Sequence, residues 1–151
     1  MQADVQSLQT LLAHAERERD AAQSALRQAE EAEARGQAQA GQLHSYRGEY
    51  HQRWSSRFAQ SGTATLVQCH HGFGQRLDQA IDQQARQVTQ LSQRVAQARM
   101  LLLQREQRVA AVRKLIERRL EAARKLADRR DQKRSDEAAQ RAAWAARTPT
   151  S

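Results

Sequence analysis

Residues 77–126 read "LDQAIDQQARQVTQLSQRVAQARMLLLQREQRVAAVRKLIERRLEAARKL", and this stretch decides the fold. Apolar side chains recur along it in two interleaved series with a spacing of seven. One series is apolar throughout and consists of Ile81, Val88, Val95, Leu102, Val109, Ile116 and Ala123. The other is apolar at five of its eight positions, namely Leu77, Gln84, Leu91, Ala98, Arg105, Val112, Arg119 and Leu126. A repeat of seven over this length predicts a helix whose apolar stripe packs on a partner helix as a coiled coil, and it excludes disorder.

The N-terminal half carries a weaker version of the same pattern. Eleven of sixteen positions are apolar in two series, one with Val5, Leu12, Arg19, Leu26, Glu33, Ala40, Arg47 and Trp54, the other with Leu8, Ala15, Ala22, Ala29, Gly36, Leu43, Tyr50 and Arg57. Many of these residues are alanines, which let helices approach closely but bury little area. Because Glu33 and Gly36 both lie on the stripe, the register can slip there.

Between the halves lies "QSGTATLVQCHHGFGQ", residues 60–75. Gly62 suits the position after a helix and Thr63 suits an N-cap, while Thr65 offers a second capping box with Gln68. We therefore predict an all-α fold in which two long helices form an antiparallel coiled-coil hairpin. The expected boundaries are one domain over 1–151, with helices over about 3–60 and 66–147, a turn over about 61–65 and a frayed tail over 148–151. Pairing about position 62 brings the start of the chain to about residue 121, so the second helix is expected to overhang the first.

The composition and motifs argue against an enzyme. The chain has 151 residues, of which 39% are hydrophobic and 4% aromatic, so it has little with which to enclose a cleft. No Walker loop, Rossmann fingerprint or HExxH is present. Cys69, His70 and His71 are adjacent, but neighbours on a helix point about 100° apart and no second cluster completes a tetrahedral metal site. We expect no catalytic residue, no metal and no cofactor.

The chain also lacks the marks of secretion and membrane insertion. Its N-terminus shows no secretory signal, and no segment approaches eighteen apolar residues. The single cysteine, Cys69, excludes an intrachain disulfide framework. These features lead us to expect a cytoplasmic protein without membrane insertion.

The net charge of +8 is confined to one segment. Residues 1–98 hold ten basic and ten acidic side chains, whereas residues 99–134 hold thirteen basic and five acidic ones. Such a helix can be a solvated face, a ligand for nucleic-acid phosphates or a ligand for an acidic protein surface. The interleaved acids and the scarcity of aromatic residues weaken the nucleic-acid interpretation, so we favour an acidic protein partner.

Four of the six aromatic residues fall in "YRGEYHQRWSSRF", residues 46–58. Tyr50 and Trp54 lie on the apolar stripe and can fill the wide end of the seam near the turn. Tyr46 and Phe58 flank the stripe and are expected to be exposed. Exposed rings that cluster together mark an interaction site.

The sequence resembles the family of the flagellar export protein FliJ. The resemblance spans nearly the whole chain and is carried by the length, the two-helix pattern, "YRGEY" at 46–50, "DQAIDQQ" at 78–84 and "LADRRDQKRSDEAAQRAA" at 126–143. It implies an antiparallel coiled coil similar to the central stalk of rotary ATPases, which binds and stimulates the hexameric export ATPase FliI. It also implies contacts with the cytoplasmic domain of the export-gate protein FlhA and with export chaperones, at the cytoplasmic face of the inner membrane at the flagellar base.

The family's gate-docking pattern is matched here by Gln39, Leu43, Tyr46, Tyr50, Phe73, Leu77 and Ala80, while Gln84 stands where a histidine is expected. The resemblance implies that this face is exposed, whereas the heptad register places Leu43, Tyr50 and Leu77 on the seam. A register slip at Glu33 and Gly36, or a bend at Gly72 and Gly74, would reconcile the two.

Our hypothesis is that the basic overhang engages the ATPase ring and the aromatic end engages the export gate. The candidate ATPase contacts are Arg118, Arg119, Arg124, Lys125, Arg129, Arg130, Lys133 and Arg134. A coiled-coil protein associated with nucleic acid and a generic homodimeric scaffold are the alternatives.

Overall fold

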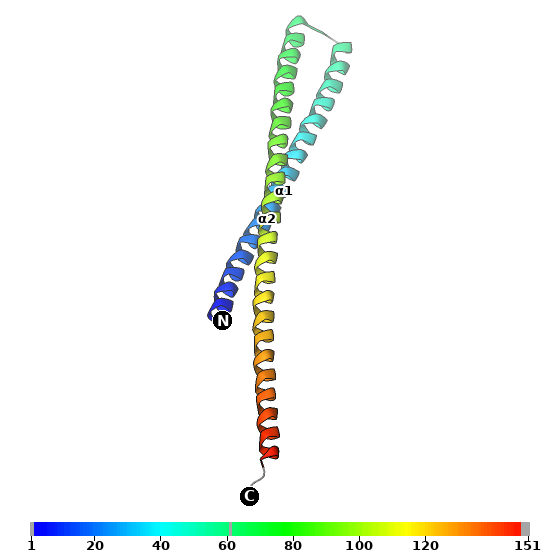
Figure 1. Cartoon of the computed structure of the whole chain (residues 1–151). Coiled ribbons are helices and arrows are strands. Elements are labelled where there is room, and N and C mark those ends of the chain that lie inside the picture. Colours follow the sequence, from blue (N-terminus) through cyan, green and yellow to red (C-terminus); the bar gives the residue numbers. More distant parts are fainter. Residues whose placement is uncertain (1, 61, 149–151) are drawn as a thin grey trace. The chain divides into compact units, whose positions relative to one another are not determined.

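The computed structural model describes residues 2–60 and 62–148 and confirms the predicted all-α hairpin. Helix α1 spans Gln2–Gln60, and helix α2 spans Ala64–Arg147 and returns antiparallel to it (Figure 1). Ser61 of the predicted turn, and residues 149–151 of the predicted tail, lie outside the described residues. Both helices are rich in Ala, Gln, Arg, Glu and Leu, all of which have high helix propensity.

Thr63 starts α2 as its N-cap. Its hydroxyl Oγ1 accepts a hydrogen bond from the backbone N–H of Leu66 at 3.4 Å, and its carbonyl accepts one from the N–H of Val67 at 3.1 Å. This is the geometry of a threonine N-cap, so Thr63 and not Thr65 provides the start signal.

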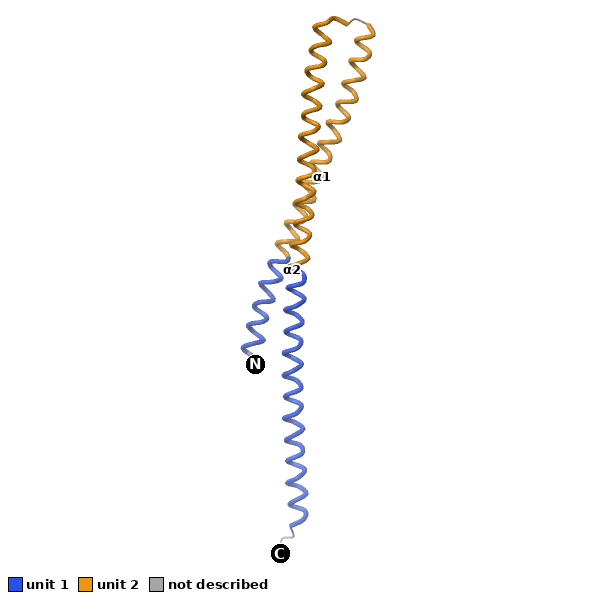
Figure 2. The backbone as a smooth tube through the Cα atoms, turned by 45° about the horizontal axis from the view of Figure 1, so that its top comes forward, with its two compact units in different colours: residues 1–19, 105–151 blue, residues 20–104 orange. Residues whose placement is uncertain are grey.

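The hairpin divides into two compact units (Figure 2). The turn unit comprises residues 20–104 and contains the reversal. The terminal unit comprises residues 1–19 and 105–151 and contains both chain ends.

The core of the turn unit follows the predicted stripes. Leu77, Ile81 and Val95 of α2 are buried, as is Ala22 of α1. The remaining stripe positions of this unit are half-buried or buried on both helices, except Arg57 near the turn, which is exposed. Two interhelical ion pairs flank the seam, between Arg47 and Asp78 at 3.2 Å and between Arg99 and Glu30 at 3.6 Å.

Gly36 is a point of close approach and not a point of slippage. It is buried, and a Cβ placed on it would lie 2.7 Å from Leu91 Cδ1, so the leucine side chain occupies the space that the glycine leaves free. Its carbonyl accepts a hydrogen bond from Gln84 Nε2 at 3.1 Å. Ala29 before it and Ala40 after it both keep their places on the stripe. The register is therefore continuous, and the slip considered from the sequence does not occur.

The terminal unit combines a small apolar seam with a ladder of ion pairs. Ala15, Val109 and Val112 are buried. Each arginine of the ladder reaches from α2 to an acid of α1, which fixes the antiparallel register through charge as well as packing. The pairs are Arg105–Glu18 at 3.0 Å, Arg108–Glu18 at 3.1 Å, Arg113–Glu16 at 3.2 Å and Arg119–Asp4 at 3.3 Å.

Glu18 receives the densest set of charges in this ladder. Desolvation raises the pKa of its carboxyl, but the attraction of Arg105, His14 and Arg108 outweighs desolvation, and the pKa lies below its ordinary value. The Nε2 atom of His14 lies 3.0 Å from Glu18 Oε1. Glu18 is therefore charged at neutral pH, and through it Arg105 and Arg108 of α2 are linked to α1.

The C-terminal part of α2 extends past the start of α1 within the terminal unit (Figures 1 and 2). We call residues 120–148 the overhang. Ala123 is half-buried, and every other side chain of the overhang is exposed. The helix nevertheless continues to Arg147. Along the overhang the helix is therefore supported by the high helix propensity of its many Ala, Arg, Lys and Glu residues and not by packing.

No helix in the described part of the chain is long and apolar enough to cross a lipid bilayer.

Candidate functional site

The first candidate site is a cluster of rings in the turn unit, centred on His70. The His70 ring stacks on Tyr50, with a centroid distance of 5.0 Å and an interplanar angle of 24°. Trp54 and Phe58 contact the same imidazole at 5.1 and 5.3 Å, and Phe73 completes the group at 4.7 Å from Tyr50. These five residues form what we call the aromatic cluster. Ring pairs at such distances contribute packing energy beyond the area that they bury.

Polar atoms inside the cluster are only partly satisfied. Tyr50 Oη donates a hydrogen bond to the carbonyl oxygen of His70 at 3.4 Å. Burial raises the pKa of the Tyr50 phenol, and Tyr46 and Cys69 raise it further, so the phenol stays protonated as a donor. His70 Nδ1 is buried and has no hydrogen-bond partner among the described residues. The imidazole therefore acts here mainly as a flat packing surface.

The aromatic residues agree with the sequence prediction at three of four positions. Tyr50 and Trp54 are half-buried on the seam, and Tyr46 is 48% exposed. The prediction for Phe58 was wrong, since it is half-buried. Its ring packs against Trp54 at 5.2 Å as well as against His70, and these contacts cover it.

Sequence reasoning missed the role of His70. It treated this residue only as part of a possible metal cluster with its neighbours. The signal was nevertheless present, because His70 lies seven residues before Leu77 and so continues the stripe towards the turn. A polar residue on the stripe was not recognised as part of the packing.

The candidate gate-contact residues are brought together on one part of the turn unit. Tyr46 lies edge-to-face with Phe73 at 6.5 Å, which links the α1 members of the set to the α2 members. Gln84 Nε2 donates to Gln39 Oε1 at 3.3 Å as well as to the carbonyl of Gly36. A shallow hollow of about 460 Å³ lies among Gln39, Gln42, Leu43, Tyr46 and Gln84.

Members of this set differ in exposure. Gln39, Tyr46 and Phe73 are exposed; Leu43, Tyr50 and Ala80 are half-buried; and Leu77 is buried at 7%. The heptad register placed Leu43, Tyr50 and Leu77 on the seam, and these residues are indeed half-buried or buried, while other members of the set are exposed beside them. No register slip is needed to bring the set together. Helix α2 also runs through Gly72 and Gly74 without interruption.

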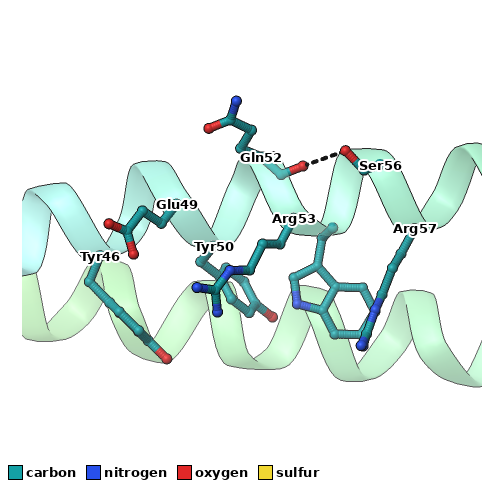
Figure 3. Close-up of a pocket in the computed structure, with 8 residues that line it drawn as sticks. Tyr46, Glu49, Tyr50, Gln52, Arg53, Ser56 and Arg57 are labelled. Carbon is teal, nitrogen blue, oxygen red and sulfur yellow. Dashed lines mark hydrogen bonds between the residues drawn. The ribbon is translucent and has the colours of Figure 1, made fainter.

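A second hollow, of about 520 Å³, adjoins the rings on α1 and carries basic groups. Figure 3 shows Tyr46, Tyr50, Arg53 and Arg57 extending from one side of the helix, while Gln52 points away. The guanidinium carbon of Arg57 lies 5.9 Å from the centre of the Trp54 ring, within reach of a cation–π interaction. No acidic residue occurs between Glu49 and Asp78. The turn end therefore presents rings and cations together.

The second candidate site is the run of basic side chains from Arg118 to Arg134. All eight candidate ATPase contacts are exposed. Arg119 is paired with Asp4, and Lys125 lies 3.7 Å from Glu121 of its own helix. The other six form no ion pair within the part of the chain that the structure describes, and they are Arg118, Arg124, Arg129, Arg130, Lys133 and Arg134.

The interhelical ladder thus ends at Asp4 and Arg119, and the run of unpaired cations lies beside and beyond this end. Cations before this point are neutralised in part by α1, whereas those of the overhang remain available to another molecule. Two leucines, Leu120 and Leu126, are 49% and 38% exposed on the same segment. The overhang therefore carries both positive charge and exposed leucine side chains on its surface.

Metal chemistry finds no support in the geometry of the turn end. Cys69 is exposed, and His71 Nε2 lies 3.3 Å from Gln75 Nε2. Among residues 2–60 and 62–148, no three His, Cys, Asp or Glu side chains are grouped closely enough to hold a metal ion.

Comparison with protein families gives one match. Residues 4–148 match the family described as "Flagellar FliJ protein". A search of curated proteins finds no significant match.

Proposed function

The chain belongs to the family of flagellar FliJ proteins, which are non-enzymatic components of flagellar export, and on this premise we propose that it is a stalk and adaptor of the export apparatus. Its role lies in flagellar protein export, and it associates with the export machinery. In the proposal, the overhang binds and stimulates the hexameric export ATPase FliI. The turn unit contacts the cytoplasmic domain of the export-gate protein FlhA.

The end of the ion-pair ladder carries the ATPase part of this proposal. Up to Arg119, the arginines that face α1 are used within the hairpin, as the 3.3 Å pair with Asp4 illustrates. Beyond that residue, no cation of the described chain pairs with α1, and Lys125 and Arg141 pair only with acids of their own helix. Complementary charge speeds association and fixes orientation, so an acidic surface inside a ring is a suitable receptor.

The exposed rings of the turn unit support the gate contact. Tyr46 and Phe73 are exposed, yet Tyr46 packs on the Phe73 ring and Phe73 packs on Tyr50, so little side-chain entropy is lost when a partner covers them. Gln39 is held beside them through Gln84. Leu77, at 7% exposed, contributes little area to this surface.

Binding of export chaperones and a position at the cytoplasmic face of the inner membrane complete the proposal. Both rest on family membership, because no particular residue of the chain points to them. The catalytic step belongs to the ATPase, and this chain contributes binding and orientation.

Hydrolysis of ATP by the cognate export ATPase tests the proposal. We expect the intact chain to stimulate hydrolysis and a chain that ends at Arg119 to lose that stimulation. The shortened chain keeps the six interhelical ion pairs described above, including Asp4–Arg119, so the hairpin should remain folded. Circular dichroism and hydrogen exchange provide the control. Equal stimulation by both chains would contradict a role for the overhang, and stimulation by neither would contradict the ATPase role.

A further inference from the structure

Trp144 is the most exposed large apolar side chain in the described part of the chain, with 70% of its surface accessible. It lies on the last turns of α2, within the segment 137–147, which we call the terminal segment. A tryptophan on a solvated helix is unusual, because this side chain loses the largest favourable burial when it is left in water. Its exposure indicates that a partner covers it.

The helix ends three residues after Trp144, at Arg147. The carbonyl oxygen of Trp144 accepts hydrogen bonds from the N–H of Thr148 at 3.2 Å and from its hydroxyl at 3.1 Å. The indole is therefore presented from an ordered helical turn. A side chain whose backbone is already ordered loses less entropy on binding.

The surroundings of Trp144 suit a helix that lies in a groove. Glu137, Gln140, Arg141 and Trp144 share one exposed helix face at spacings of three, four and seven. Alanines fill most of the remaining positions, namely Ala138, Ala139, Ala142, Ala143, Ala145 and Ala146. One large ring with a polar rim and small neighbours is the arrangement of a binding hot spot.

The terminal segment differs in charge from the run before it. It holds Glu137, Arg141 and Arg147, whereas residues 118–134 hold most of the unpaired cations. Trp144 lies ten residues beyond Arg134 on the same helix, which corresponds to about 15 Å. The two features form one continuous surface, first cationic and then apolar.

We propose that Trp144 is the apolar anchor of the overhang and inserts into a pocket of the export ATPase about 15 Å from the acidic surface that receives the cations. This inference rests on the proposed function, since it takes the ATPase as the partner that the cationic run selects. The cations set the rate and orientation of the encounter, and the buried indole sets the lifetime of the complex. Continuity of the two features on one unpartnered helix favours a single partner for both.

Equilibrium binding of the full chain to the ATPase hexamer tests the anchor. The single cysteine, Cys69, is exposed in the turn unit, outside the overhang, and can carry a fluorophore for anisotropy measurements. We expect Trp144→Ala to weaken binding about 30-fold, the scale of a tryptophan hot spot, and Trp144→Phe to weaken it less. Met100→Ala is the matched control, because Met100 is 66% exposed in the turn unit, and we expect less than about a two-fold change.

The outcomes separate the anchor from the proposed function. Binding by the unchanged chain, with a large loss for Trp144→Ala alone, supports the anchor. Equal binding by the unchanged chain and Trp144→Ala overturns the anchor and leaves the proposed function standing. Failure of the unchanged chain to bind overturns both. A mass measurement that shows Trp144-dependent dimers of this chain, without the ATPase, also overturns the anchor as an ATPase contact.

Discussion

Reversing the charge of Arg124, Arg129, Arg130 and Arg134 to Glu is expected to weaken binding of the intact chain to the export ATPase by about 100-fold at low salt. Each exposed cation that meets an acidic group contributes up to about 1 kcal/mol, and reversal adds repulsion to the loss of attraction. These four side chains make no ion pair within the described residues, so their replacement leaves the hairpin's own contacts unchanged. Titration calorimetry at several ionic strengths measures the effect.

A matched set of four exposed arginines in the turn unit provides the control, namely Arg35, Arg76, Arg86 and Arg94. Reversing these changes the net charge of the chain by the same amount. If both sets weaken binding equally, the attraction is a property of net charge and not of the overhang. Retention on DNA that depends on the overhang set would instead favour the nucleic-acid alternative.

Truncating His70 to Ala is expected to lower the free energy of unfolding of the turn unit by about 2 kcal/mol. The imidazole contacts Tyr50, Trp54 and Phe58, and its removal leaves a void among these rings. The Tyr50 hydrogen bond goes to the backbone carbonyl of His70 and survives the change, so the loss reports ring packing. Denaturant unfolding followed by Trp54 fluorescence, in a Trp144→Phe background, measures it.

Replacing His70 with Phe separates packing from polarity. Phenylalanine keeps a flat ring and removes Nδ1, which is buried without a partner among the described residues. We expect the free energy of unfolding to stay within about 0.5 kcal/mol of the original or to rise, because a buried unsatisfied polar atom is removed. An equal loss for Phe and Ala would show that the imidazole nitrogens are needed and would contradict a packing role.

Heptad periodicity determined most of the fold. All seven positions from Ile81 to Ala123 lie inward in the structure, because a repeat of seven is enforced by packing at every turn. Pairing about position 62 placed the start of the chain near residue 121, and the structure pairs Asp4 with Arg119. Local capping chemistry likewise identified Thr63.

Features that depend on the opposite helix were not accessible from the sequence. Gly36 was taken as a place where the register can slip. In the structure, the Leu91 side chain occupies the space beside Gly36, and Gln84 donates a hydrogen bond to the Gly36 carbonyl. The sequence also assigned the whole charge excess to residues 99–134, without dividing those residues into arginines that pair with α1 and cations that stay unpaired. The division arises because residues such as Arg113 meet acids of α1, and those contacts follow from the three-dimensional register alone.

The sequence predicted which segments hold the candidate sites, but not which side chains of those segments are exposed. The aromatic stretch pointed to the turn end, yet the exposure of Phe73 and the burial of Leu77 depend on how the two helices pack on each other. Trp144 drew no notice in a sequence where alanines surround it. Its significance appears once the interhelical pairing is seen to stop at Arg119, well before Trp144 along α2.

Site-specific photo-cross-linking tests the contact between the overhang and the ATPase most directly. A benzoylphenylalanine is placed at Arg130 in one chain and at Met100 in another, and each is irradiated with the assembled ATPase hexamer. Both positions are exposed, but only Arg130 belongs to the overhang. We predict a covalent adduct with the ATPase from position 130 and none from position 100. An adduct from position 100 alone, or none from position 130 under conditions in which the chain binds, would contradict the account.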